Sequence, residues 1–214
     1  YSQKMTLYTA VQNGDSEQVR NLLSRPQHEV NVNEIQDGKT PLFVACLNGY
    51  TQIVQMLLAR QDIDINRRCV NEKKEKMKRE EMTALHAAIE NEFTPIARLL
   101  LSVPNIDVNI KYTEQSQDKM KEKTALIMAV KKENIEIVEL LLSRPNTDVN
   151  IKYIKRSSDK EEEDTALTIA CDKKNARICQ LLLARPNIDT NIKSIKKSKE
   201  KSKEMTALHI AVDK

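Results

Sequence analysis

The sequence has few glycine and aromatic residues, and it lacks the motifs of common catalytic sites and the long apolar runs of membrane-spanning proteins. Among its 214 residues are only three glycines, no tryptophan, and 3% aromatic residues. It has no glycine-rich phosphate loop, no nucleophile elbow and no His-x-x-His spacing. No apolar run approaches the roughly 20 residues that cross a bilayer, and no signal peptide is visible. Enzymatic activity is therefore not expected of this segment.

What the sequence does contain is one phrase repeated at a nearly constant spacing. The copies begin with a threonine that is followed by a small residue or proline and then by leucine. They start at Thr40, Thr83, Thr124, Thr165 and Thr206, in steps of 43, 41, 41 and 41 residues, after a weaker copy at Met5. A fixed period of this size indicates a stacked repeat array. Such arrays form extended surfaces that bind other macromolecules.

Each repeat has the pattern of two short helices. In the repeat that begins at Thr83, the threonine is a suitable helix N-cap, and a compact run of small and apolar residues follows at 84–90. A second segment at 94–101 has apolar residues at helical spacing and ends before Pro104. Neither helix is long enough to be stable alone in water, so the repeats must stack to bury their apolar faces.

This unit resembles the ankyrin repeat. The resemblance is carried by Thr-Pro-Leu-x-x-Ala at 40–45, by Ile-Val-x-x-Leu-Leu at 53–58, and by a closing Asp-x-Asn, as at 107–109. It covers the chain from about Met5 to Lys214. The resemblance implies an all-α solenoid of helix-turn-helix units that binds proteins, is not an enzyme and uses no cofactor or metal.

The repeats predict one elongated domain over residues 1–214. Their expected bounds are 5–39, 40–82, 83–123, 124–164, 165–205 and, for a partial repeat, 206–214. Solenoids need polar capping repeats at their ends, and the last repeat stops inside its first helix. We therefore expect a piece of a longer protein. We also expect this piece to be a monomer.

The later repeats are longer than the family's usual repeat of about 33 residues. The extra residues follow each Asp-x-Asn, in 14-residue connecting fingers at 110–123, 151–164 and 192–205. Alternating apolar residues at the start of a finger, such as Val108 and Ile110, favour a strand. We predict extended β-hairpins that are ordered near the base and mobile at the tip. The alternative is loose loops.

The turn between the two helices loses its glycine along the chain. Gly14 and Gly49 fill this place in the first repeats, and Glu92, Glu133 and Lys174 replace glycine in the later ones. We expect a neighbouring asparagine to take up the left-handed backbone conformation instead, which would leave these turns slightly strained. The asparagines concerned are Asn91, Asn134 and Asn175.

The cysteines and histidines have structural explanations. Three cysteines, Cys46, Cys171 and Cys179, stand where other repeats have alanine or valine, so we expect them in the core. Cys69 lies in a finger, so its side chain need not be buried. No pair has the spacing of a zinc site, and reduced thiols in a core favour a cytoplasmic or nuclear location. The resemblance implies that histidines such as His86 tie neighbouring repeats together.

Positive charge is concentrated in the fingers. The net charge of the chain is +4, and the segments 67–82 and 192–205 carry +3 and +4. Lysines on hairpins can neutralise phosphates, so binding of nucleic acid or an anionic membrane is the alternative function. Acidic residues are interleaved with the lysines and aromatics are scarce, which is more typical of a solvated surface.

The resemblance implies a partner-binding surface on the concave face, which the fingers and first helices form. We predict a partly apolar groove there with a basic rim. The groove residues are Val44, Met82, Ala87, Met128 and Ile169, and the rim residues are Lys123 and Lys131. The alternative is that this apolar stripe only covers the neighbouring first helix. On the first interpretation the chain is a scaffold or adaptor for a protein partner whose identity the sequence does not give.

Overall fold

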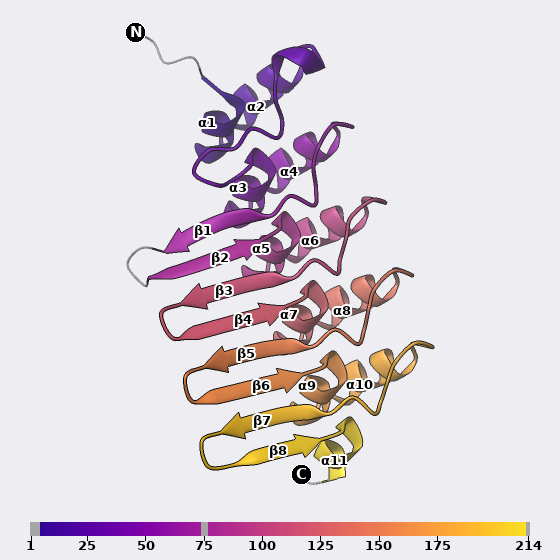
Figure 1. Cartoon of the computed structure of the whole chain (residues 1–214). Helices are drawn as coiled ribbons and strands as arrows, with labels where there is room; N and C mark the ends of the chain where they lie inside the picture. The colour runs from indigo at the N-terminus through magenta and orange to yellow at the C-terminus, as the bar shows by residue number, and fades with distance from the viewer. Residues whose placement is uncertain (1–4, 74–76, 213–214) are drawn as a thin grey trace. The chain divides into compact units, whose positions relative to one another are not determined.

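The computed structural model describes residues 5–73 and 77–212 (Figure 1). The chain divides into two compact units. Unit 1 is Tyr1–Asn71 with Glu81–Asp107, and unit 2 is Glu72–Glu80 with Val108–Lys214. Two segments lie outside the described residues: the tip of the first long finger, 74–76, and the end of the partial repeat, 213–214. The expectation of a mobile tip at 74–76 therefore falls on residues that the structure does not describe.

Unit 1 stacks three helix pairs. The pairs are α1 (Leu7–Gln12) with α2 (Ser16–Leu23), α3 (Pro41–Asn48) with α4 (Thr51–Leu58), and α5 (Ala84–Glu90) with α6 (Thr94–Leu101); the 3-10 turn η1 (Gln27–Glu29) follows α2. The repeated threonine starts each first helix. At α3, the Oγ1 atom of Thr40 accepts the backbone N–H of Phe43 at 3.3 Å, and Pro41 occupies the first helical position, where its missing N–H costs nothing.

Unit 2 continues the same construction with five helices among its described residues. They are α7 (Ala125–Lys131), α8 (Ile135–Leu142), α9 (Ala166–Asp172), α10 (Ala176–Leu183) and α11 (Ala207–Val212). Thr124 and Thr165 cap α7 and α9 through their hydroxyl oxygens. The core between the helices consists mainly of alanine, leucine, isoleucine and valine, so hydrophobic burial between repeats holds helices that are too short to stand alone.

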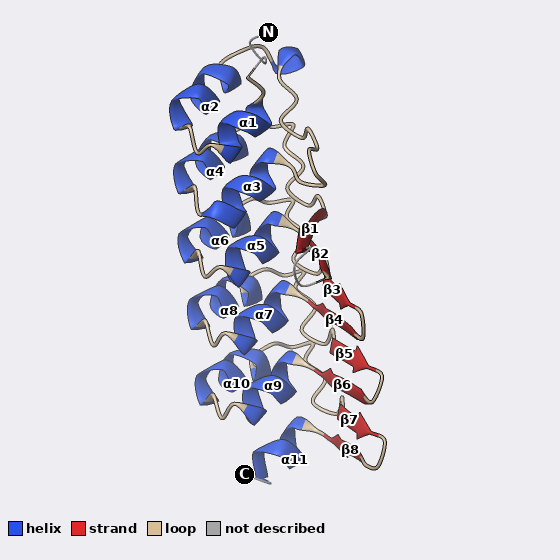
Figure 2. Ribbon diagram, turned by 90° about the vertical axis from the view of Figure 1, so that its left-hand side faces the viewer, coloured by secondary structure: helices blue, strands red, loops and turns tan. Residues whose placement is uncertain are grey.

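The fingers of unit 2 are hairpins that join edge to edge. The strands are β3 (Tyr112–Ser116), β4 (Lys119–Lys123), β5 (Tyr153–Ser157), β6 (Lys160–Asp164), β7 (Ser194–Ser198) and β8 (Ser202–Met205). Besides the pairing within each hairpin, β4 pairs with β5 and β6 pairs with β7, all antiparallel. Figure 2 shows these strands of unit 2 gathered on one side of its helices.

The first long finger contributes β1 (Cys69–Lys73) and β2 (Lys78–Met82), each of which straddles the boundary between the units. The described residues of its outer part, 72–73 and 77–80, belong to unit 2, and their strands extend the sheet beyond β3. In the described ranges 5–73 and 77–212, the strands follow chain order from β1 to β8 in a single sheet.

The predicted all-α class was therefore wrong, because the protein has a mixed α/β architecture with an antiparallel sheet of eight strands in its described part. The prediction of β-hairpins, rather than loops, was correct for the fingers at 110–123, 151–164 and 192–205. Packed helices lie about 8–10 Å apart, and two strand spacings are about 9.5 Å. Stacked repeats thus bring successive hairpins to hydrogen-bonding distance, and separate hairpins become one sheet.

The turns that lack glycine are strained in a different way from the one expected. The left-handed conformation is adopted by the replacing residues themselves. They are Glu92, Glu133 and Lys174, with φ of 60°, 55° and 58°. Asn134 and Asn175 have φ of −80° and −86° and instead cap α8 and α10, where each side-chain oxygen accepts a backbone N–H at 3.1 Å. Assigning the left-handed position to the asparagines was wrong.

A ladder of asparagine side chains links successive repeats. The side-chain Nδ2 of Asn109 donates to the carbonyl of Asn146 at 2.7 Å, and its Oδ1 accepts the N–H of Asp148 at 2.9 Å. Asn150 makes both bonds again one repeat later, at 2.8 and 2.9 Å, and Asn66 makes them within unit 1. The closing Asp-x-Asn therefore fixes how one repeat sits on the next, which sets the register of the hairpins.

The cysteines depart in part from expectation. Cys46 is buried, as expected, but Cys69 is also buried, with its thiol 3.7 Å from the Thr40 hydroxyl. Cys171 and Cys179 are only half-buried, and their Sγ atoms lie 3.7 Å apart. All four are free thiols. Burial raises the pKa of the Cys171 thiol to about 12, and the neighbouring Cys179 adds to this, which keeps the Cys171 thiol protonated.

Candidate functional site

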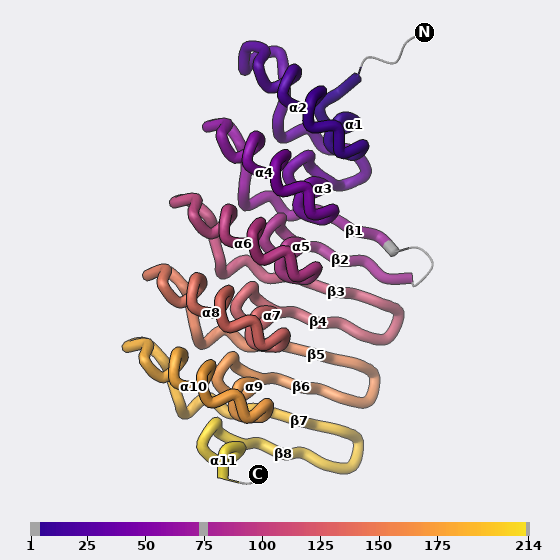
Figure 3. Tube along the Cα trace, turned by 180° about the vertical axis from the view of Figure 1, so that it is seen from behind, coloured from indigo at the N-terminus to yellow at the C-terminus, as the bar shows by residue number. Residues whose placement is uncertain are grey.

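The sheet of unit 2 has two faces of unlike charge. Successive side chains of a strand point to opposite faces, so the pairing register assigns each residue to one face. Across β3 to β8, one face, the lysine face, carries seven lysines and two glutamates on its two outer rows: Lys119, Lys121, Lys155, Lys160, Lys196, Lys201 and Lys203, with Glu114 and Glu162. The hairpins that carry these rows extend away from the helix pairs of unit 2 in Figure 3.

The opposite side, the glutamate face, carries four glutamates and two cations on its two outer rows. They are Glu122, Glu161, Glu163 and Glu204, with Arg156 and Lys197. Three lysines from the finger bases neutralise this face at a 41-residue period: Lys111, Lys152 and Lys193 lie 2.9, 2.8 and 3.3 Å from Glu122, Glu163 and Glu204. Most of the excess positive charge of the hairpins therefore lies on the lysine face.

The outermost row of the lysine face alternates serine and lysine. Each hairpin turn has the sequence Ser-x-Asp/Glu-Lys, beginning at Ser116, Ser157 and Ser198. In each turn the serine hydroxyl donates to the carbonyl of the lysine three residues later, at 3.4–3.5 Å. Between hairpins, Lys119 pairs with Ser157 and Lys160 pairs with Ser198. We call Ser116, Lys119, Ser157, Lys160, Ser198 and Lys201 the serine–lysine row.

At the base of the lysine face, two lysines lie over buried tyrosine rings. The ammonium of Lys123 is 4.5 Å from the centroid of the Tyr112 ring, and that of Lys131, at the end of α7, is 3.1 Å from the centroid of the Tyr153 ring. Burial lowers the pKa of Lys131 to about 8, although the carboxylates of Glu162 and Asp164 raise it. The contact with α7 shows that the lysine face is the one turned toward the first helices.

A buried polar network joins the outer part of the first finger to β3 and β4. The carboxylate of Glu80, only 3% exposed, lies 2.6 Å from Lys78 and 3.1 Å from the hydroxyl of Tyr112. Glu114 accepts from Tyr112 at 2.9 Å and pairs with Lys121 at 2.7 Å and with Lys78 at 3.0 Å. Burial raises the pKa of Glu114, but these three donors outweigh it and bring the pKa to about 2.

Burial raises the pKa of Tyr112 in the same network, and the charges of Glu80 and Glu114 raise it further. The Tyr112 hydroxyl therefore stays protonated and acts as a donor to both carboxylates. Every one of these charged groups has a partner, so the network is suited to holding the strands together rather than to proton transfer.

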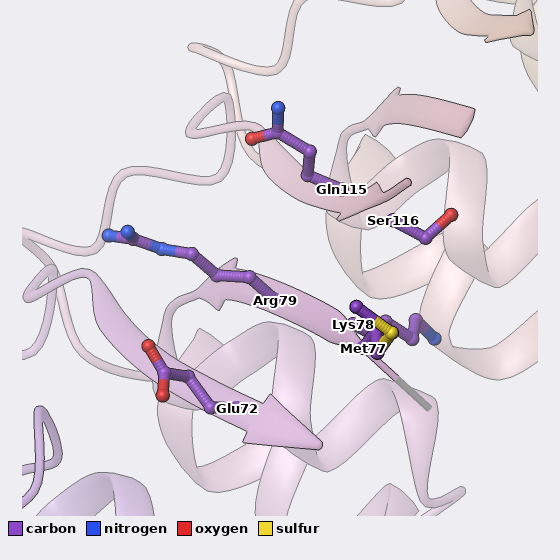
Figure 4. Close-up of a pocket in the computed structure, with 6 residues that line it drawn as sticks. All are labelled: Glu72, Met77, Lys78, Arg79, Gln115 and Ser116. Atoms are coloured by element: carbon purple, nitrogen blue, oxygen red, sulfur yellow. The ribbon is translucent and has the colours of Figure 1, made fainter. Parts of the chain in front are cut away.

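A hollow of about 340 Å³ lies along the outer part of the first finger (Figure 4). Its lining comes from three strands and a hairpin end: Glu72, Met77, Lys78, Arg79, Gln115 and Ser116. It holds no nucleophile with an adjacent base, and Lys78 is already engaged by Glu80 and Glu114. This arrangement does not point to catalysis.

The structure places the five predicted groove residues in the core. Val44, Met82, Ala87, Met128 and Ile169 are each no more than 7% exposed. Their burial favours the alternative interpretation, in which the stripe packs against neighbouring elements. The two predicted rim residues, Lys123 and Lys131, are half-buried and lie together with Tyr112 and Tyr153 at the base of the lysine face.

The serine–lysine row was missed by the sequence reasoning. Finger charges were added up one finger at a time, which gives −1 for 151–164 and hides the lysines that line one face. The Ser-x-Asp/Glu-Lys turn recurs at the 41-residue period, and combining this signal with strand alternation would have found the row.

His86 bonds to the threonine that precedes its own helix. The Nδ1 atom of His86 accepts the N–H of Thr83 at 3.2 Å and lies 2.8 Å from the Thr83 hydroxyl, so these bonds hold the start of α5.

Across residues 5–73 and 77–212, no group of three or more His, Cys, Asp or Glu side chains is placed to hold a metal ion. None of the helices in that part of the chain is both long and apolar enough to span a bilayer.

Comparison with known proteins identifies the repeats. The family model described as Ankyrin repeats (3 copies) matches residues 2–69 and 69–153, and the model described as Ankyrin repeat matches residues 162–195. No curated protein matches the chain. The matched segments cover most of the 214 residues and coincide with the helix pairs and the asparagine ladder. The chain belongs to the ankyrin-repeat family.

Proposed function

We propose that this protein is a non-catalytic scaffold or adaptor that binds a protein partner on its concave side, where the lysine face of the sheet meets the first helices. Ankyrin repeats are protein–protein interaction modules and are generally not catalytic. The observation that carries the proposal is the lysine face itself. It is a two-row array of lysines whose base contacts α7 through Lys131 and Tyr153, and stacking of the repeats alone does not require this charge.

The proposed contact residues follow from burial. The apolar stripe supports the surface from below, because Met128 and Ile169 are buried in α7 and α9. Lys123 and Lys131 present half-buried ammonium groups, each held over a tyrosine ring. Positioned cations of this kind lose little side-chain entropy when they bind an anionic or polar group. We also propose a cytoplasmic or nuclear location for the protein, on the basis of its free thiols.

The test is a pull-down from lysate at about 100 mM and about 500 mM salt, with and without nuclease. Two double variants are compared with the wild type. K123Q/K131Q removes the cations at the base of the lysine face, and K173Q/K174Q removes two lysines at the turn after α9. The expected result is a discrete protein that survives nuclease, is recovered less at high salt because its contacts with the lysines are screened, and is lost only from K123Q/K131Q.

Recovery only at low salt and only without nuclease would contradict the proposal and favour nucleic-acid binding. Equal recovery by both double variants would place the partner elsewhere on the protein. Thermal unfolding of each variant, followed by circular dichroism, checks that loss of binding is not loss of fold.

A further inference from the structure

We propose that the partner segment bound by the lysine face is an extended acidic peptide with carboxylate or phosphate groups at every third residue. The inference rests on the proposed function, because it names the partner's chemistry for the same sheet. It concerns the outer end of the hairpins, where the serine–lysine row lies, and not the tyrosine-backed base.

The spacing of the row sets the spacing of the ligand. Lys119, Lys160 and Lys201 stand at equivalent positions of successive hairpins, two strands apart. Two strand spacings are about 9.5 Å. A peptide in the extended polyproline II conformation has three residues per turn and advances about 3.1 Å per residue, so side chains three residues apart lie on the same side, about 9.3 Å apart. Such a peptide, crossing the strands along the row, therefore presents one side chain to each of these lysines at every third position.

The positive charge at the row is available for a ligand. Lys119, Lys160 and Lys201, together with Lys196 on the next row inward, line a hollow of about 710 Å³. Within the described part of the chain, these four lysines have no carboxylate within 4 Å, unlike most of their neighbours.

Several carboxylates line the same hollow, but most are already neutralised. Glu161 lies 2.8 Å from Arg156, Glu162 lies 3.4 Å from Lys155, and Asp159 lies 2.6 Å from Lys199. The free cations therefore alternate with serine hydroxyls and paired charges rather than forming a uniform positive surface. Alternation of this kind suits a ligand whose own charges are separated by neutral residues.

The same observations favour a peptide over single-stranded nucleic acid. Proteins that bind single strands stack bases on aromatic side chains, and the tyrosines of this face, Tyr112 and Tyr153, are buried at its base. A polyphosphate backbone places a charge at every nucleotide and would meet carboxylates that line the hollow, such as that of Asp118. A peptide with spaced acids places neutral residues at those points.

The experiment is direct binding of labelled 12-residue peptides to the whole chain, followed by fluorescence anisotropy at about 50 and about 200 mM salt. One peptide has glutamate at every third position in a Ser/Gly background. A second has the same composition with its glutamates in one block, and a single-stranded oligonucleotide is the third probe. The protein variants are K119S/K160S/K201S, which empties the row, and K111S/K152S/K193S. The latter removes the same number of lysines, at the same 41-residue period, from the glutamate face.

The expected result is that the spaced peptide binds more tightly than the blocked one. We expect K119S/K160S/K201S to lose about tenfold in affinity, as for three lost exposed ion pairs, while K111S/K152S/K193S stays within about twofold. Equal binding of the two peptides, no loss in the row variant, or tighter row-dependent binding of the oligonucleotide would overturn the proposal. These peptides do not depend on the pull-down, so a partner captured through Lys123 and Lys131 would uphold the proposed function even if the peptides fail.

Discussion

The ammonium of Lys131 lies 3.1 Å from the centroid of the Tyr153 ring, across the junction between α7 and the sheet of unit 2. A cation held over an aromatic face is attracted by the ring quadrupole, and here it also bridges the first helix and the finger of one repeat, 124–164. The ankyrin-type helix stack and the sheet are therefore joined by a specific contact and not only by the chain that connects them.

The burial of Lys131 predicts that part of the stability depends on alkaline pH. The pKa of Lys131 is about 8 in the folded protein, against an ordinary value of 10.5. The unfolded chain therefore binds more protons between these values, so this residue makes the free energy of unfolding rise with pH from about 8 to 10.5. In K131M that contribution is absent. Melting temperatures of both proteins, measured from pH 7 to 10, should show the wild type gaining relative to K131M; a constant difference would contradict the low pKa.

The network around Glu114 predicts a dependence of the same sign in the acid range. The pKa of Glu114 is about 2, below its ordinary value of 4.5. A carboxylate of this kind stabilises the fold above pH 4.5, and the contribution is lost as pH falls toward 2. E114Q should lower the free energy of unfolding at pH 7 by about 1–3 kcal/mol.

The gap between E114Q and the wild type should close between pH 4.5 and 2 in urea titrations. E122Q is the matched control, because Glu122 lies on the same strand β4 as Lys121 but on the glutamate face, where it pairs with Lys111. An effect of E122Q as large as that of E114Q would show that the network contributes nothing specific.

The strained turn at Lys174 predicts a stabilising substitution. A non-glycine residue in the left-handed conformation costs roughly 1–2 kcal/mol relative to glycine, and Lys174 has φ of 58°. K174G should therefore stabilise the protein by about 1 kcal/mol. K173G, one residue earlier at φ of −78°, has no strain to relieve and should be neutral or destabilising. Chemical denaturation compares the two, and an equal effect of both would reject the strain.

The asparagine ladder predicts a large difference between two asparagines of one contact. N109A removes the side chain that donates to the Asn146 carbonyl and accepts from the Asp148 N–H, and should cost about 1–3 kcal/mol. N146A keeps the backbone carbonyl that Asn109 uses, and so should cost much less. Equal losses in urea unfolding would mean that the ladder does not fix the repeats.

Much of the fold was predictable because it depends on local chemistry. Thr124 and Thr165 cap helices wherever the phrase recurs, and the alternation from Val108 onward gave the start of a strand. The joining of hairpins was not predictable in the same way, since it depends on the match between helix stacking distance and strand spacing. No single finger carries that information.

The candidate site was harder to predict than the fold. Met128 and Ile169 are apolar and repeat-periodic, and the sequence did not distinguish a partner groove from packing between helices; their burial favours packing. The charges of Lys119, Lys160 and Lys201 were visible in the sequence, but their placement on one face needs the pairing register. A residue's face is a property of the sheet, and the sheet forms only between repeats.

The central claim is that a partner binds the lysine face of the sheet. It is tested most directly by hydrogen exchange and mass spectrometry of the protein alone and with the partner captured in the pull-down. The account predicts protected amides in 112–123 and 153–164 without the partner, because their strands are paired, and further protection there when the partner is bound. Rapid exchange in these hairpins, or partner-induced protection confined to the second helices α8 and α10, would contradict it.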